Sequence, residues 1–138
     1  MGLDKNAIDS LQEQAREAAR FSYSPYSKFR VGAALLASDG TVYRGANIEN
    51  RSYGLANCAE RSAVFLALSQ GVTSFDAIAI YSPDSEEMLT PCGACRQVLS
   101  EFVGPDFPVY CGSADGQFQI IAMKELLPYD ALRDFRQR

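Results

Sequence analysis

Apolar residues recur at two different spacings along the first third of the chain. In residues 4–22 they return every three or four positions, which predicts a helix that Asp4 caps. In residues 29–35 they occupy every second position, which predicts a strand. The turn around Asp39-Gly40 is a hairpin signal and leads into a second strand at 41–46.

The same reading predicts the order of the remaining elements. They are a helix at 58–70, a strand at 75–81, a helix at 91–103, strands at 107–111 and 117–122, a short helix at 123–127 and a helix in the tail at 130–138. Helices between successive strands imply parallel neighbours in the middle of the sheet. Residues 112–116 leave no room for a crossover helix, so the last strand is expected to run antiparallel. The expected fold class is α/β, with a mixed sheet of about five strands between two helical layers.

Composition narrows the class of protein. The chain of 138 residues has no internal repeat or linker, so we expect a single domain over residues 1–138. Its net charge of -4 disfavours electrostatic binding of nucleic acid. No apolar stretch is long enough for a membrane span, and residues 1–10 do not form a signal peptide, so we expect a cytoplasmic protein. The chain contains no His, which excludes His-dependent catalysis and His-ligated metal.

The cysteines are the first candidates for chemistry. In a cytoplasmic protein they are better read as metal ligands or reactive thiols than as a disulfide framework. Cys92 and Cys95 share a first helical turn, and Cys58 lies at another predicted helix start. Three thiolates leave the fourth position of a zinc ion open, which is typical of catalytic zinc. Cys111 lies in an apolar strand and is read as a buried core thiol.

Charged residues flank these cysteines. Glu60 lies two positions after Cys58, where it can move protons without ligating the metal. Three thiolates on a divalent ion leave a net charge of -1. Arg61 and Arg96 are each adjacent to a site residue, so we expect them to offset this charge by donating to sulfur, although ordinary salt bridges remain an alternative for both.

Taken together, several motifs resemble the small homotetrameric zinc-dependent cytidine deaminase family. The matching segments are Tyr26-Ser27-Lys28-Phe29-Arg30-Val31-Gly32-Ala33-Ala34, Asn47-Ile48-Glu49-Asn50, Cys58-Ala59-Glu60-Arg61 and Pro91-Cys92-Gly93-Ala94-Cys95-Arg96-Gln97. The match covers roughly residues 5–128. The resemblance implies the three-layer α/β/α deaminase fold and one zinc ion per subunit. It also implies hydrolytic deamination of cytidine and deoxycytidine, in pyrimidine salvage.

The resemblance further implies a role for individual residues. Glu60 would carry protons, and the main-chain amide of Ala59 would meet the carbonyl oxygen of the base. Asn47 and Glu49 would hold the 3'-hydroxyl of the ribose. The remaining implied contacts are Phe29 packing on the base, unless it is simply a core residue, Val31 nearby, and Tyr53 and Arg51 reaching a neighbouring subunit of a homotetramer.

Two departures from the family pattern concern the substrate. Arg51 stands where close relatives often carry a small residue near a neighbour's pocket. Ala131 stands where relatives often carry a Phe that covers the substrate of an adjacent subunit, a role that Tyr129 or Phe135 could take over. They motivate one alternative, a deaminase of the same fold acting on a modified pyrimidine nucleoside or an aminonucleoside antibiotic. An alternative of another class is a non-catalytic zinc protein or a thiol redox protein, because Pro91-Cys92 to Cys95 by itself also fits a redox pair.

Overall fold

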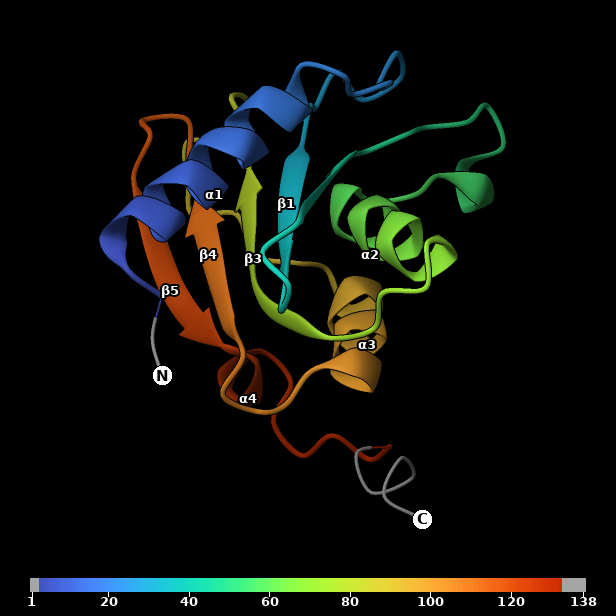
Figure 1. Cartoon of the computed structure of the whole chain (residues 1–138). Helices are drawn as coiled ribbons and strands as arrows, with labels where there is room; N and C mark the ends of the chain where they lie inside the picture. The colour runs from blue at the N-terminus through green and yellow to red at the C-terminus, as the bar shows by residue number, and fades with distance from the viewer. Residues whose placement is uncertain (1–2, 133–138) are drawn as a thin grey trace.

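A computed structural model describes residues 3–132 of the chain. Its elements are α1 (Lys5–Ala19), β1 (Gly32–Ala37), β2 (Val42–Ala46), η1 (Tyr53–Leu55), α2 (Ala59–Ser69), β3 (Phe75–Tyr81), α3 (Gly93–Phe102), β4 (Pro108–Gly112), β5 (Phe118–Ala122) and α4 (Met123–Leu126). The strands form one mixed sheet in the order β2-β1-β3-β4-β5 (Figure 1). Within the described residues, no helix is both long enough and apolar enough to cross a membrane.

The strand directions confirm the predicted fold class. β3 and β4 run parallel, with Ile78 opposite Val109, and the last strand β5 runs antiparallel to β4 as expected. The sequence also predicted that β2 and β3, which α2 connects, are neighbours in the sheet, and this is wrong. β2 and β3 point the same way, but β1 lies between them and is antiparallel to both. The tight hairpin pairs β2 with one edge of β1, so the crossover through α2 can reach only the other edge.

Helices cover both faces of the sheet, α1 on one side and α2 with α3 on the other (Figure 1). Successive residues of β1 show the two-sided burial directly. Ala34 packs with Leu11 of α1, whereas Leu35 packs with Ala63 of α2. This alternation follows from the period of two along a strand, and both sets are buried because each face carries a helix.

Two glycines allow the helices to approach the strands closely. A Cβ atom at Gly32 would lie 2.2 Å from the main-chain oxygen of Ala15 in α1. A Cβ atom at Gly45 would lie 2.5 Å from the main-chain nitrogen of Ala63 in α2. Only glycine fits at these contacts, and the second one sets the position of α2 against the sheet.

The ends of several elements differ from the sequence prediction. β1 begins at Gly32, so Phe29 and Val31 precede the strand. Cys58 and Cys92 are the caps that precede α2 and α3, because both have extended backbone. Near the C-terminus, residues 131 and 132 lie in a turn, and the rest of the predicted tail helix, with Phe135, lies outside the described residues.

Candidate active site

Three cysteine sulfur atoms meet where the N-termini of α2 and α3 converge. Cys58 and Cys92 precede the two helices, and Cys95 is buried in the first turn of α3. The three Sγ atoms all lie within 4.8 Å of one another. The Sγ atom of Cys92 is 3.7 Å from that of Cys58 and 3.5 Å from that of Cys95.

This cluster suits a zinc ion. With zinc–sulfur bonds of about 2.3 Å, two ligands of a tetrahedral site lie roughly 3.8 Å apart, close to the measured separations. The main-chain amides at both helix N-termini favour the thiolate form of the cysteines. The position of Arg61 also favours a metal site with three thiolate ligands. Its Nη2 donates to Cys58 Sγ at 3.2 Å, and its buried Nε has no hydrogen-bond partner within residues 3–132. A cation beside negatively charged sulfur is what a three-thiolate site requires.

The thiols of the cluster differ in acidity. Hydrogen bonds from Cys95 and from Arg61 lower the pKa of Cys58 to about 5, although burial opposes this. The same contact raises the pKa of Cys95, because its thiol donates to the Cys58 thiolate and is itself buried.

Glu60 lies in the first turn of α2 and is only 5% exposed. Burial, with a smaller contribution from the nearby Cys58 thiolate, raises the pKa of its carboxyl to about 7. The structure thus has a carboxyl whose pKa lies near neutral pH beside the sulfur cluster.

A pocket of about 460 Å³ opens over the cluster. The residues that the sequence singled out for substrate all line it: Phe29, Val31, Asn47, Glu49 and Ala59. Cys58, Cys92, Glu60 and Arg61 line it as well. The pocket is therefore shared between the predicted metal site and the predicted substrate contacts, which come from separate parts of the chain.

Comparisons with known proteins agree with this site. A family model described as "Cytidine and deoxycytidylate deaminase zinc-binding region" matches residues 5–111. The chain belongs to this deaminase family. It is 52% identical over 126 residues to a cytidine deaminase of Halalkalibacterium halodurans, covering 91% of this chain and 92% of that protein. It is 49% identical to a cytidine deaminase of Sporosarcina psychrophila, covering 88% of each.

Solved structures of cytidine deaminases have the same fold as this family member. The structure from Burkholderia pseudomallei superposes with a TM-score of 0.83 at 44% identity, covering 87% of this chain and 95% of that one. The structure from Mycobacterium tuberculosis gives a TM-score of 0.78 at 37% identity, covering 92% of this chain and 96% of that one. The expected three-layer deaminase fold is thus confirmed.

One predicted contact differs in this family member. Arg96 was expected to donate to a thiolate, as Arg61 does. Within residues 3–132, the hydrogen bonds of Arg96 instead end on main-chain carbonyls, from Nε to Pro91 at 2.7 Å and from Nη1 to Leu126 at 2.8 Å. The reason is that α4 returns next to α3 and presents an unpaired C-terminal carbonyl to the guanidinium. Arg96 therefore joins the loop before Cys92 to the end of α4.

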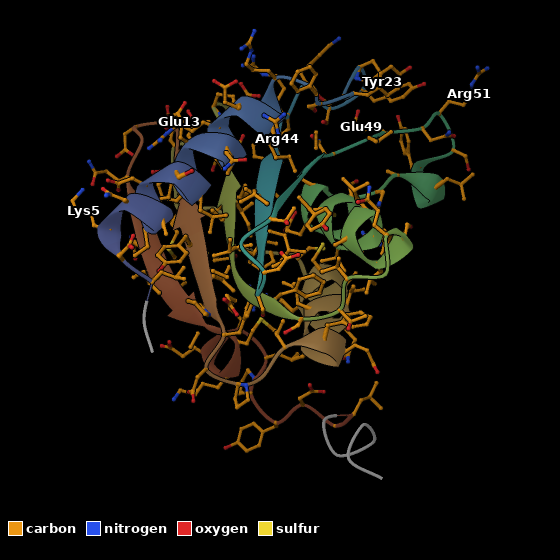
Figure 2. The ribbon with its side chains drawn as sticks, viewed as in Figure 1. Lys5, Glu13, Tyr23, Arg44, Glu49 and Arg51 are labelled. Carbon is orange, nitrogen blue, oxygen red and sulfur yellow. The ribbon has the colours of Figure 1, made fainter. Side chains whose placement is uncertain are left out.

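The two residues expected at a neighbouring subunit lie outside the pocket of this family member. Tyr53 is 76% exposed, and its ring meets the edge of Tyr26 at 5.9 Å between centroids. A second hollow of about 380 Å³ lies beside these two rings. Arg51 is exposed and projects outward from the loop between β2 and η1 (Figure 2). Both side chains are therefore accessible to another chain.

Sequence reasoning did not assign a role to five residues of the pocket wall. They are Ser27, Ala56, Asn57, Leu89 and Thr90. Ser27 lies inside a recognised motif and Thr90 directly precedes Pro91, so proximity to a motif is the signal that could have found them. Asn57 directly precedes Cys58 and could have been found in the same way, whereas Ala56 and Leu89 lie two positions before a motif.

Proposed function

We propose that this chain is a zinc-dependent enzyme that deaminates cytidine and deoxycytidine to uridine and deoxyuridine, releasing ammonia, in pyrimidine salvage. The observation that carries the proposal is the arrangement of three cysteine sulfurs and the buried Glu60 in one pocket. Relatives up to 52% identical over most of their length bear the name cytidine deaminase. The thiol redox alternative explains neither Glu60 nor membership of a zinc-binding deaminase family.

Cys58, Cys92 and Cys95 would hold one zinc ion per chain. When bound, the ion supplies Lewis-acid activation of the attacking water. Arg61 offsets the excess negative charge through its hydrogen bond to Cys58 Sγ. The three cysteines come from two helix N-termini that the sheet holds in place, so the site is built on rigid elements.

Glu60 would move the protons of the reaction. Hydrolysis replaces the amino group at C4 of the pyrimidine with an oxygen from water, so both protons of that water must be moved. One must reach the ring nitrogen, where it stays in the product, and the other must reach the amine, which leaves as ammonia. A carboxyl group buried beside the metal site can accept and return these protons while bulk water is excluded. The position of Glu60 in the lining of the pocket supports this role.

The pocket wall would hold the nucleoside. Ala59 begins α2, and the first N–H groups of a helix have no partner within it, so its amide is free to donate to the base carbonyl. Phe29 and Val31 would contact the base, and Asn47 and Glu49 the sugar.

We also propose that residues 1–138 act as a single domain, that the enzyme is cytoplasmic and that it forms a homotetramer. The exposed apolar residues support the homotetramer. Phe21, Tyr53 and Leu55 are each more than two-thirds exposed, at 71%, 76% and 72%. Burying such side chains between subunits would stabilise an assembly. Tyr53 and Arg51 are the residues proposed to reach the neighbouring chain.

The decisive experiment follows the loss of ultraviolet absorbance of cytidine with the zinc-loaded protein and with Glu60→Gln. We expect rapid loss with the wild type and a rate roughly 10²- to 10⁴-fold lower with the variant, at equal zinc content. Full activity of Glu60→Gln would contradict the proton-carrying role. A zinc-loaded wild type that leaves cytidine and deoxycytidine unchanged would contradict the substrate, and a panel of modified pyrimidine nucleosides would then identify it.

A further inference from the structure

The segment between α1 and β1 carries Phe29 and Val31 into the pocket but belongs to no strand itself. Its main chain makes one tight turn, in which Lys28 N donates to Ser24 O at 3.0 Å. Lys28 adopts a left-handed conformation with φ of 62°, which is unfavourable for a side chain of this kind. Other contacts must therefore hold the segment in place.

Asn47, directly after β2, supplies several of these contacts. Its Nδ2 donates to the main-chain oxygen of Phe29 at 2.8 Å, and its Oδ1 accepts from the main-chain nitrogen of Val31 at 2.9 Å. Oδ1 also accepts from the hydroxyl of Ser22. The main-chain nitrogen of Asn47 donates to Val31 O at 3.2 Å. A single residue thus provides the hydrogen bonds that a neighbouring strand would otherwise give to the segment.

Glu49 supports the same segment from the other side. Its Oε1 accepts from the main-chain nitrogens of Tyr26 at 3.0 Å and Ser27 at 3.2 Å. Its Oε2 accepts from the Ser27 hydroxyl, whose oxygen in turn accepts from Phe29 N at 3.0 Å. Glu49 lies below the loop that carries Tyr23 (Figure 2), and its main-chain nitrogen donates to Tyr23 O at 2.8 Å. Both peptide groups of Phe29 are therefore held, directly or through Ser27, by the segment after β2.

Most hydrogen-bonding groups of the Asn47 side chain already have partners within the protein. A side-chain amide has two hydrogens to donate and two lone pairs that accept. Val31 and Ser22 occupy both acceptor sites of Oδ1, and Phe29 takes one hydrogen of Nδ2. One hydrogen is left for a ligand. The Asn47 side chain therefore makes most of its hydrogen bonds to the protein itself.

We propose that Asn47 is a positioning residue, which sets Phe29 and Val31 against the base independently of any contact with the sugar. The inference deepens the proposed function and rests on it, because it concerns the same pocket. Its consequence is specific: the loss of Asn47 impairs the reaction even for a nucleoside that has no 3'-hydroxyl.

The kinetic test compares cytidine with 3'-deoxycytidine, using the zinc-loaded wild type, Asn47→Ala and Asn47→Asp. Asp is nearly isosteric and can still accept from Val31 N and from a sugar hydroxyl, but it cannot donate to Phe29 O. We expect kcat/KM for 3'-deoxycytidine to fall between about tenfold and a hundredfold in both variants, and kcat/KM for cytidine to fall at least as much, since cytidine also loses any contact of Asn47 with its 3'-hydroxyl. A loss confined to cytidine, or full rescue by Asn47→Asp, would overturn the proposal.

A second measurement needs no substrate. Hydrogen exchange of the Val31 amide is measured in the wild type, in Asn47→Ala and in Asn57→Ala. Asn57 lines the same pocket, but its Nδ2 donates to Ser62 Oγ at 3.3 Å rather than to the segment before β1, so it is a matched control. We expect exchange at Val31 to accelerate about tenfold or more in Asn47→Ala alone.

Unchanged exchange at Val31 in Asn47→Ala would overturn the positioning role, as would equal acceleration in Asn57→Ala. If the wild type deaminates neither nucleoside, the proposed function fails, and the exchange comparison then decides the role of Asn47 without it. The two failures are therefore distinguishable.

Discussion

Arg30 donates three hydrogen bonds to the carboxylate of Asp84. They come from its main-chain nitrogen at 2.9 Å, from Nε at 2.9 Å and from Nη2 at 2.8 Å. The pair joins the segment that carries Phe29 to the segment after β3 that leads toward Cys92. Both segments line the pocket, one through Phe29 and the other through Leu89. The contact thus links two parts of the site that are far apart in sequence.

The link predicts how stability depends on pH. Hydrogen bonds from Arg30 lower the pKa of Asp84 to about 2. A carboxyl whose pKa is lowered on folding stabilises the protein above its unfolded pKa of about 3.9, and this contribution is lost as the pH falls through the folded value. Because the side chain of Arg30 is 53% exposed, Asp84→Asn should cost only about 0.5 to 1 kcal/mol at neutral pH.

Urea unfolding of the wild type and Asp84→Asn from pH 7 to pH 2 measures this dependence. The difference in unfolding free energy should be constant above about pH 5 and shrink between about pH 4 and pH 2. Arg30→Gln should show the same trend, since it removes the other partner. A difference that grows as the pH falls would contradict the ion pair.

The proposed zinc ligands make a prediction about metal content. Cys58→Ala, Cys92→Ala and Cys95→Ala should each lose most of the zinc after dialysis, because three ligands are needed to hold the ion. Cys111→Ala is the matched control, since Cys111 is buried in β4 outside the sulfur cluster. Elemental analysis should find about one zinc per chain in the wild type and in Cys111→Ala. Full zinc content in Cys95→Ala would show that the ligand assignment is wrong.

Arg96 is expected to hold the loop before Cys92 in place through hydrogen bonds to main-chain oxygens. Arg96→Gln removes the hydrogen bonds to Pro91 and Leu126, and should lower the free energy of unfolding by about 2 kcal/mol, because hydrogen bonds from charged donors are worth about that much. The loosened loop should also release zinc to a chelator faster. Arg20→Gln is the control, since Arg20 is 74% exposed and far from the loop in sequence. Equal stability and equal zinc release in the two variants would contradict this role.

Because α1 lies so close to β1, adding one methyl group at Gly32 should strongly destabilise the fold. Gly32→Ala would place a Cβ atom 2.2 Å from Ala15 O, a main-chain atom that cannot turn aside. We expect a loss of about 3 kcal/mol or failure to fold, measured by thermal and urea unfolding. Gly104→Ala, where the added atom meets nothing within 4 Å, should change stability by less than about 0.5 kcal/mol. Similar stability of the two variants would contradict the packing.

Local patterns predicted much of the fold and of the candidate site. The strand at residues 75–81 is confirmed without change, because an apolar run interrupted only by Asp76 between polar loops marks a buried strand. The cysteines and Glu60 were recognisable because they follow one another at short spacing at two helix starts. The strand expected at 29–35 begins only at Gly32, since Asn47 takes the hydrogen bonds that a partner strand would make.

The sequence by itself determined the order of the elements, the thiol chemistry of the site and the family of the protein, because these depend on residues close together along the chain. Only the tertiary structure decided that β1 lies between β2 and β3, that Arg96 reaches Leu126 and that Asn47 holds Phe29. Asn47 meets Phe29 only when the β1–β2 hairpin has closed, and Arg96 meets Leu126 only when the chain has returned through β4 and β5. No periodicity or motif encodes them, since a hydrogen bond depends on distance in space and not on separation in sequence.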